Sequence, residues 1–394
     1  MELKPGVHWV GVVDWALRHF HGHELSTHRG SAYNAFLIKQ EKTVLIDTVW
    51  GPFADEFLAN LRTLVDPASI DIVVVNHSEP DHSGALPALM ELCPNAQVVV
   101  SKRGMESVPG HYHKQWNFTP VKTGDRIRIG KDELVFIEAT MLHWPDSMFT
   151  YLTGANILMP NDAFGQHYAT AYRFNDQVDQ HELYEEALKY YANILTPFSD
   201  QVIRKIDELT AMNLPVDIIA PSHGVMWRTD PMQIVHKYRQ WAMQEGKKQA
   251  VIVYDSMWHA TRRMAEAVGD GLAGEGVPFK LYHIAVSDRN DVLAEIFQSK
   301  GLAVGSSTVN RNLLPSLFPI LEEIKGLRFK NKTAAAFGSY GWSGECVKLI
   351  EEHFGKCNMP LAGAGIAAKW QPTTEDLEKC RNLGKQLAEA IKKA

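Results

Sequence analysis

Cysteine is scarce in this chain, and its four cysteines are isolated residues: Cys93, Cys346, Cys357 and Cys380. None of them forms a Cys-x-x-Cys pair with another, which argues against a zinc ribbon, rubredoxin-type iron and a cysteine-ligated iron–sulfur cluster. Isolated cysteines are instead typical of reduced thiols in a cytoplasmic protein.

Targeting signals and a strong charge are also missing. The first residues lack the apolar core of a signal peptide, and no run approaches the roughly 18 apolar residues that span a bilayer. The formal charge of −6 is small for 394 residues, so it gives no electrostatic reason to expect nucleic acid or an anionic membrane as a partner. We expect a cytoplasmic globular protein.

The length of 394 residues exceeds that of one ordinary domain. A polar segment at residues 244–249 follows a predicted helix and separates two halves with different strand patterns. We therefore predict one domain over residues 1–246 and a second over residues 247–394.

The hexapeptide at residues 77–82 is crowded with metal-ligand side chains: His77, Glu79, Asp81 and His82. It follows an apolar run at 72–75, which predicts a buried strand, and precedes a predicted helix that begins at Ser83. Ligands packed between a strand and a helix indicate a metal site with rigid flanks.

Three more candidate ligands follow later predicted strands. The runs at 134–139, 156–159 and 216–220 lead to His143, Asp162 and His223. If these strands share a sheet, their loops converge on one rim. A single histidine is often a hydrogen-bonded core residue, but the crowding favours metal ligation. The seven candidates suffice for two metals with Asp162 as a bridge, and imidazole with carboxylate permits zinc, manganese or iron.

A histidine-rich segment lies near the N-terminus: His19, His21, His23 and His28. We expect it to form a loop near the main site or plain surface rather than a second metal site. A helix is predicted over residues 180–194.

The second half alternates strands and helices. Strands predicted at 250–254, 279–284, 302–305, 333–337 and 360–367, with helices between them, indicate a doubly wound parallel sheet. The size suits a flavodoxin-like domain with strand order 2-1-3-4-5 and a ligand at the switch point.

Three polar loops follow the first, third and fourth of these strands, and together they predict an FMN site. The first opens a helix, which suits a single phosphate, and the others carry edge donors and aromatic rings for a planar heterocycle. The chain has no Gly-x-Gly-x-x-Gly for a dinucleotide and no Walker lysine. The predicted cofactor-binding residues are Ser256, Met257, Trp258, His259, Ala260, Thr261, Ser306, Ser307, Thr308, Asn310, Ser339, Tyr340, Gly341, Trp342, Ser343 and Gly344.

With its wide spacing to His143, Asp162 and His223, the His-x-Glu-x-Asp-His hexapeptide resembles the metallo-β-lactamase-like domain of the flavodiiron proteins. Residues 141–148, 161–166 and 190–194 resemble the same family, and the likeness extends over essentially the whole chain, close to the two-domain core of the flavorubredoxin branch. Hydrolases of the superfamily usually carry histidine where Glu79 stands, and the carboxylate favours iron over zinc. The expected fold is an αββα metallo-β-lactamase-like domain followed by a flavodoxin-like domain.

The resemblance implies a diiron site. One iron would be held by His77, Glu79 and His143, the other by Asp81, His82 and His223, with Asp162 as the bridge. In some relatives, water displaces the residue that matches His82.

Other family implications concern residues around the two sites. Tyr190 or Tyr191, with Tyr191 preferred, and His167 are catalytic candidates as donors near the pocket, with ordinary packing as the alternative. Ser307 stands where many relatives have proline.

The resemblance also implies a reaction. A flavin and two ferrous irons together hold the electrons that reduce O2 to water or NO to N2O. A separate rubredoxin-type donor, or its reductase, is the expected electron source. A head-to-tail homodimer, alone or as a dimer of dimers, is the expected assembly. The alternatives are a zinc-dependent hydrolase fused to a flavodoxin-like domain and a non-catalytic electron carrier.

Overall fold

The computed structural model describes residues 1–393, and the chain divides into two compact units. The first unit contains residues 1–190 and 198–242, and the second contains residues 191–197 and the described residues from 243 on. Helix α7 (Met232–Ala242) ends the first unit, and strand β17 (Lys247–Tyr254) begins the sheet of the second. No helix within residues 1–393 has the length and apolar character needed to cross a membrane.

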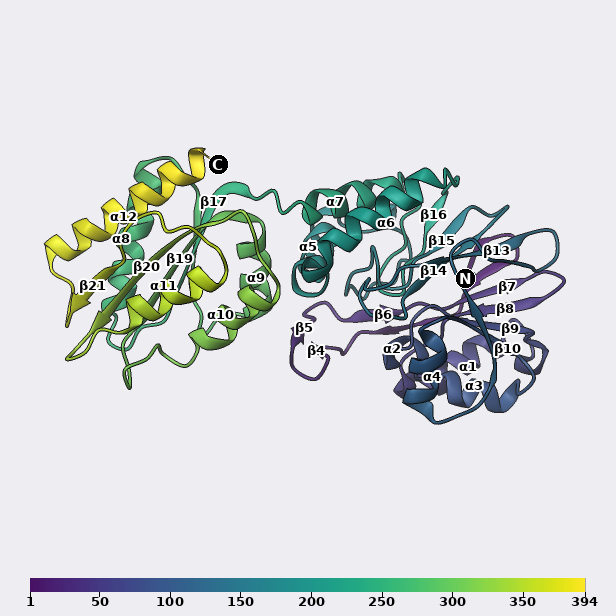
Figure 1. The fold of residues 1–394 in the computed structure, drawn as a ribbon. Coiled ribbons are helices and arrows are strands. Elements are labelled where there is room, and N and C mark those ends of the chain that lie inside the picture. Colours follow the sequence, from purple (N-terminus) through teal and green to yellow (C-terminus); the bar gives the residue numbers. More distant parts are fainter. Residues whose placement is uncertain (394) are drawn as a thin grey trace. The chain divides into compact units, whose positions relative to one another are not determined.

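Two sheets form the centre of the first unit (Figure 1). One has the order β1-β2-β7-β8-β9-β10-β11, with the bounds Glu2–Lys4, Val7–Trp9, Phe36–Lys39, Thr43–Ile46, Ile72–Val75, Gln97–Ser101 and Asn117–Val121. The other has the order β12-β13-β14-β15-β16, with the bounds Arg126–Arg128, Glu133–Glu138, Met148–Leu152, Ile157–Met159 and Ile218–Ile219. Two short pairs complete the unit: β3 (Val12–Asp14) with β6 (Ser31–Tyr33), and β4 (His19–Phe20) with β5 (Leu25–Ser26).

A single hydrophobic cluster joins the two sheets. Phe36 and Val74 reach it from the first sheet, and Phe136 and Met159 reach it from the second. Helices lie outside this pair of sheets (Figure 1), and their bounds are α1 Ala54–Arg62, α3 Leu86–Leu92, α4 Gly104–Tyr112, α5 Gln180–Tyr190 and α6 Ser199–Ala211, with α7 as given above. This arrangement confirms the predicted αββα fold.

Helix α2 (Pro80–Ser83) differs from the sequence prediction. A helix was predicted to begin at Ser83, after the metal-ligand segment, but α2 begins inside that segment. Proline is favoured in the first turn of a helix because its missing N–H would have no partner there. Asp81 and His82 therefore lie on a helical turn rather than in an open loop.

The predicted helix over 180–194 also ends early. Helix α5 stops at Tyr190, and a π-helical turn over Tyr191–Leu195 follows it. Pro197 lies just beyond, where it lacks an N–H and disfavours helical backbone at the residue before it. The change of helix type alters the direction of the side chains after Tyr190.

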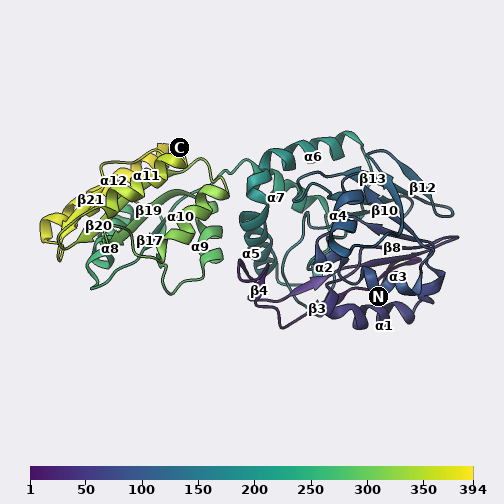
Figure 2. The same ribbon diagram turned by 60° about the horizontal axis from the view of Figure 1, so that its bottom comes forward.

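The second unit has a parallel sheet with helices on both faces (Figures 1 and 2). Its order is β18-β17-β19-β20-β21, the predicted 2-1-3-4-5 order, with β18 at Phe279–His283, β19 at Ser299–Ser307, β20 at Thr333–Tyr340 and β21 at Ile366–Lys369. The helices are α8 Ala260–Gly274, α9 Arg289–Phe297, α10 Leu317–Gly326, α11 Cys346–Lys356 and α12 Thr374–Lys393. The flavodoxin-like prediction is confirmed.

Strand β21 is shorter than predicted. The strand predicted over 360–367 begins only at Ile366. Gly363 and Gly365 precede it, and glycine weakens a strand because it adds no side chain to the packing and loses more backbone entropy.

Helices α8 and α12 pack closely through glycine. A β-carbon at Gly271 would lie 2.1 Å from the carbonyl oxygen of Arg381, and one at Gly384 would lie 2.1 Å from the carbonyl oxygen of Val268. Both distances are far below a van der Waals contact, so the two backbones meet where neither residue has a side chain. The same two helices supply much of the core of the second unit, including Val268.

Replacement of Gly271 by alanine is expected to destabilise the second unit by about 1–3 kcal/mol, because the added methyl group must separate the two helices. Thermal or urea unfolding of the variant measures this cost. Gly274→Ala is the matched control on the same helix, since no atom lies within 4 Å of its added β-carbon. Equal stability of Gly271→Ala and Gly274→Ala would contradict the close packing.

Candidate metal centre and cofactor loops

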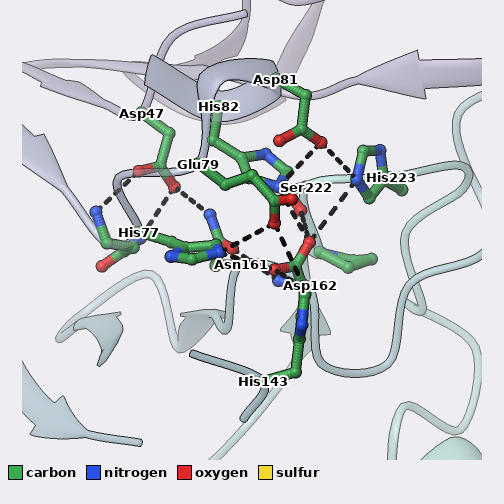
Figure 3. Close-up of polar contacts among 12 residues, drawn as sticks. Asp47, His77, Glu79, Asp81, His82, His143, Asn161, Asp162, Ser222 and His223 are labelled. Carbon is green, nitrogen blue, oxygen red and sulfur yellow. Dashed lines mark hydrogen bonds and ion pairs between the residues drawn. The ribbon is translucent and has the colours of Figure 1, made fainter. Parts of the chain in front are cut away.

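The metal centre is built at the carboxyl ends of strands in both sheets of the first unit. Strand β9 leads directly to His77 and Glu79, and α2 carries Asp81 and His82. The loops after β13, β15 and β16 bring in the remaining ligands: His143, Asp162 and His223. All seven predicted side chains meet in one place (Figure 3).

The seven side chains form two adjacent groups. In the first group, ligand atoms of His77, Glu79, His143 and Asp162 lie within 4.8 Å of one another. The second group has the same closeness and contains Asp81, His82 and His223. The division matches the two-metal pattern expected from the sequence.

Asp162 lies between the two groups (Figure 3). Its Oδ2 is 3.6 Å from Nε2 of His77 and 3.5 Å from Nε2 of His143. Its Oδ1 is 2.9 Å from Nε2 of His82 and 3.5 Å from Nε2 of His223. Each oxygen of this carboxylate thus faces a different group, which is the geometry of a bridging ligand.

Several buried atoms in this centre have no hydrogen bond among residues 1–393. They are both ring nitrogens of His82, both carboxylate oxygens of Asp81 and Oδ2 of Asp162. The His82 Nε2 is nevertheless only 3.1 Å from Oδ2 of Asp81. Ring nitrogens and carboxylate oxygens that approach without forming a hydrogen bond fit a cation between them, so these residues fit two bound metal ions.

Burial and charge act in opposite directions on the carboxylates. Burial opposes the ionisation of Glu79, but hydrogen bonds from His143, His21 and His77 outweigh it and hold the pKa of this carboxyl below its ordinary value. Burial also opposes the ionisation of Asp162, but the nearby charge of His82 keeps the pKa of Asp162 well below its usual range. Both carboxylates are therefore anionic at neutral pH.

Two outer contacts orient the histidines. The Nδ1 of His77 lies 3.1 Å from Oδ1 of Asp146, and the Nδ1 of His223 lies 2.9 Å from the carbonyl oxygen of Ala32. A hydrogen bond from Nδ1–H leaves Nε2 with its lone pair free for a metal. Asp146 also accepts a hydrogen bond from the backbone N–H of Ser78, at 2.7 Å.

Asp47 links the two sheets beneath the centre. It follows strand β8 and accepts hydrogen bonds from the backbone and the side chain of Asn76, at 2.7 and 3.0 Å. The Asn161 amide donates to the same carboxylate at 3.3 Å. Because Asn76 and Asn161 precede His77 and Asp162, this contact sets the positions of ligands from both sheets.

The structure separates the two tyrosine candidates. The Tyr190 hydroxyl donates to Oδ1 of Asp162 at 3.2 Å. The ring of Tyr191, the preferred candidate, instead lies 5.8 Å from the Phe297 ring in the second unit. Tyr190 is therefore the candidate with a hydrogen bond to this carboxylate, and Tyr191 opens the π-helical turn that follows α5.

His167 lies beside the second metal group. Its ring is 4.8 Å from the His223 ring and 5.1 Å from that of Tyr190, and its Nδ1 is 2.9 Å from Oγ of Ser31. Burial, and then the charge of His223, lower the pKa of His167 well below its ordinary value, so the imidazole is neutral. The structure thus brings His167 to the centre.

Sequence reasoning missed Asp47 and Asp146, whereas it expected the segment that contains His21 to form a loop near the main site or plain surface. His21 comes from the histidine-rich segment, and its Nε2 lies 2.9 Å from Oε1 of Glu79. Asp146 lies in the stretch at 141–148 that resembles the flavodiiron family, so this resemblance could have identified it. No local pattern marks Asp47, because its partners come from distant parts of the chain.

The cofactor loops of the second unit meet through hydroxyl groups. Thr261 Oγ1 lies 3.0 Å from Oγ of Ser307 and 2.9 Å from Oγ of Ser339, and these two serine oxygens are 3.1 Å apart. Thr261 lies in the first turn of α8, Ser307 ends β19 and Ser339 lies near the end of β20. All three side chains are buried. Oγ of Ser256 is buried without a hydrogen-bond partner in residues 1–393, which fits a phosphate oxygen beside it.

Each of the two units matches a known protein family. Residues 32–224 match the family model described as ODP family beta lactamase, and residues 252–384 match the flavodoxin model. The chain is 50% identical over 393 residues to the nitric oxide reductase of Moorella thermoacetica, with 99% of this chain and 98% of that protein covered. It is 48% identical to the anaerobic nitric oxide reductase flavorubredoxin of Aeromonas salmonicida, covering 98% of this chain and 75% of that protein.

Solved structures show the same relationship. The rubredoxin oxygen:oxidoreductase of Desulfovibrio gigas matches with a TM-score of 0.98 and 37% identity, covering 100% of this chain and 98% of that one. The flavodiiron protein of Giardia intestinalis matches with a TM-score of 0.95 and 36% identity, covering 100% and 96%. The chain is a flavodiiron protein.

Membership of the flavodiiron family makes this chain an oxidoreductase whose cofactors are FMN and a non-haem diiron site. The two metal groups around Asp162 and the unpartnered Ser256 hydroxyl fit these cofactors. The zinc-dependent hydrolase alternative is not favoured, because the relatives are reductases and the flavodoxin unit is present.

Asp146→Ala is expected to weaken iron binding about 10- to 100-fold, because His77 loses the partner that fixes its ring and the N–H of Ser78 loses its acceptor. Iron content after dialysis against a graded chelator series measures the change. Asp217→Ala is the control, since Asp217 is a half-exposed residue that pairs with Lys4. Unchanged iron retention in Asp146→Ala would show that Asp146 does not orient His77.

Proposed function

We propose that this flavodiiron protein reduces NO to N2O, O2 to water, or both, with electrons from an external rubredoxin-type donor. The main support is the pair of metal groups that share Asp162, in a chain that also has a flavodoxin unit. Relatives at 48–50% identity are named nitric oxide reductases, which favours NO. The Desulfovibrio gigas relative is named for oxygen and rubredoxin, which supports O2 as the second candidate and rubredoxin as the donor.

The proposed metal ligands are those that the family resemblance implies. His77, Glu79 and His143 hold one iron, Asp81, His82 and His223 hold the other, and Asp162 bridges them. The Nε2 of His82 lies among the acidic ligands of its group, which supports direct ligation over displacement by water. When bound, the two irons and the FMN supply the electrons for both reductions.

Two side chains beside this centre carry protons at neutral pH. Burial, and then the Asp162 charge, raise the pKa of Tyr190 well above its ordinary value, so the phenol keeps its proton at neutral pH. Tyr190 is the proposed hydrogen-bond donor to a bound gas or to its reduced product, toward which its one hydroxyl proton would turn from Asp162. His167, buried and neutral, is the second proposed catalytic residue, because it lies beside both Tyr190 and His223.

The remaining parts of the proposal concern assembly, location and the flavin residues. A head-to-tail homodimer, alone or as a dimer of dimers, places the FMN of one chain near the irons of the other, as the family resemblance implies. A cytoplasmic location stays a prediction. The FMN contacts proposed for the three loops are those predicted from the sequence.

The purified protein is expected to contain two irons and one FMN per chain, to sediment as a dimer or larger, and to consume NO, O2 or both with one reduced donor. Glu79→Ala and His143→Ala are expected to lose nearly all gas reduction while they keep FMN, because each removes an iron ligand. Metal analysis, sedimentation and turnover with each gas measure these outcomes. Zinc without iron in the purified protein would favour the zinc-dependent hydrolase. Intact turnover in both variants would favour a non-catalytic electron carrier. A fully active monomer would contradict the proposed dimer.

Tyr190→Phe and Tyr191→Phe form a matched pair. Tyr190→Phe is expected to lower turnover at least roughly tenfold with iron and FMN content unchanged, because one proton donor is lost from the pocket. Tyr191→Phe is expected to keep near-normal turnover. A larger loss in Tyr191→Phe than in Tyr190→Phe would reverse the assignment.

A further inference from the structure

The loop after strand β21 contains a tryptophan in an unusual backbone conformation. Trp370 has φ of +63°, in the left-handed region that bulky residues rarely adopt. Its side chain is 61% exposed, so burial of the ring does not explain why this residue type stands at a strained position. A strained residue that persists in a fold is held there by its surroundings, and such residues concentrate at ligand sites.

The backbone of Trp370 contacts the end of strand β20, and its ring contacts the loop that follows this strand. The Trp370 N–H donates to the carbonyl oxygen of Tyr340 at 2.7 Å. A β-carbon at Gly341 would lie 2.8 Å from Cζ3 of Trp370, so the indole ring lies directly against the Gly341 backbone. Tyr340 ends β20, and Gly341 begins the loop proposed to contact the flavin ring. Trp370 therefore restricts the position of that loop.

The next residue reaches the phosphate loop. The Gln371 amide donates to the carbonyl oxygen of Trp258 at 3.0 Å, and its Oε1 lies 3.4 Å from Nη1 of Arg263 on helix α8. Trp258 lies between Ser256, whose hydroxyl has no partner within the described residues, and the start of α8. Gln371 thus fixes the backbone of the phosphate loop from outside.

We propose that the loop at Trp370 and Gln371 is a fourth element of the flavin site, whose two positioning residues tie the ring loop to the phosphate loop. This rests on the FMN site of the proposed function and extends it to a segment that follows the fifth strand. Because the two residues hold different loops, they have separable effects. Gln371 supports recognition of the phosphate, and Trp370 supports recognition of the ring.

The test compares FMN with riboflavin, which has the same ring system and no phosphate. The full-length protein is freed of flavin, with its iron retained, and titrated with each flavin while quenching of flavin fluorescence gives Kd. Gln371→Glu keeps the size of the side chain but replaces the amide donor by a carboxylate, which cannot donate to the Trp258 carbonyl. It is expected to weaken FMN binding roughly three- to tenfold and to leave riboflavin binding unchanged.

Trp370→Asn removes the ring but retains a residue that tolerates left-handed backbone, so the loop conformation survives. It is expected to weaken FMN and riboflavin binding by a similar factor, roughly three- to tenfold. Trp15→Ala is the control, because Trp15 is a 57% exposed tryptophan in the first unit. It is expected to bind both flavins as the unaltered protein does.

The possible failures are distinguishable. If the unaltered protein does not bind FMN, the proposed function fails first. If it binds FMN and both variants bind both flavins equally well, the fourth element is overturned while the proposed function stands. Equal weakening of FMN and riboflavin in Gln371→Glu would overturn the separate role of Gln371 in phosphate recognition.

Discussion

The metal centre depends on one buried carboxylate. Asp162 turns one oxygen toward His77 and His143 and the other toward His82 and His223, so it belongs to both metal groups. A buried anion is costly unless positive charge or hydrogen-bond donors surround it. The unsatisfied atoms of Asp81 and His82 show that the protein alone does not complete this balance among its described residues. Metal ions held by the two ligand groups that share Asp162 would complete it.

The positions of the ligands come from contacts outside the metal groups. Asp47 connects the ends of β8, β9 and β15 through Asn76 and Asn161, which directly precede His77 and Asp162. Asp146 fixes the ring of His77 from the opposite side of that imidazole. The site is therefore a property of the paired sheets, and the ligand residues alone would not form it.

The cofactor site of the second unit has a different chemical character from the metal centre. The start of α8 and the ends of β19 and β20 meet there through the neutral hydroxyls of Thr261, Ser307 and Ser339. Hydroxyls can donate or accept, and they suit a phosphate and a polar ring edge more than a bare cation. Ser307 adds one of the three hydroxyls. Both units thus place their sites where strands end, but one selects metal ions and the other an organic cofactor.

The sequence by itself determined the ligand types, the two-metal interpretation and the flavodoxin-like fold of the second unit, because these follow from local patterns. The αββα fold of the first unit was expected from the resemblance to the flavodiiron proteins. Strand ends can be recognised from apolar runs, and the hexapeptide carries four ligands in six residues. Three features needed the tertiary structure: the start of α2 at Pro80, the late start of β21, and the choice of Tyr190 over Tyr191. Neighbouring helical side chains point about 100° apart, so only the path of α5 and its π-helical turn decides which phenol meets Asp162. Asp47, Asp146 and Trp370 act through partners distant in the chain, and only folding brings those partners together.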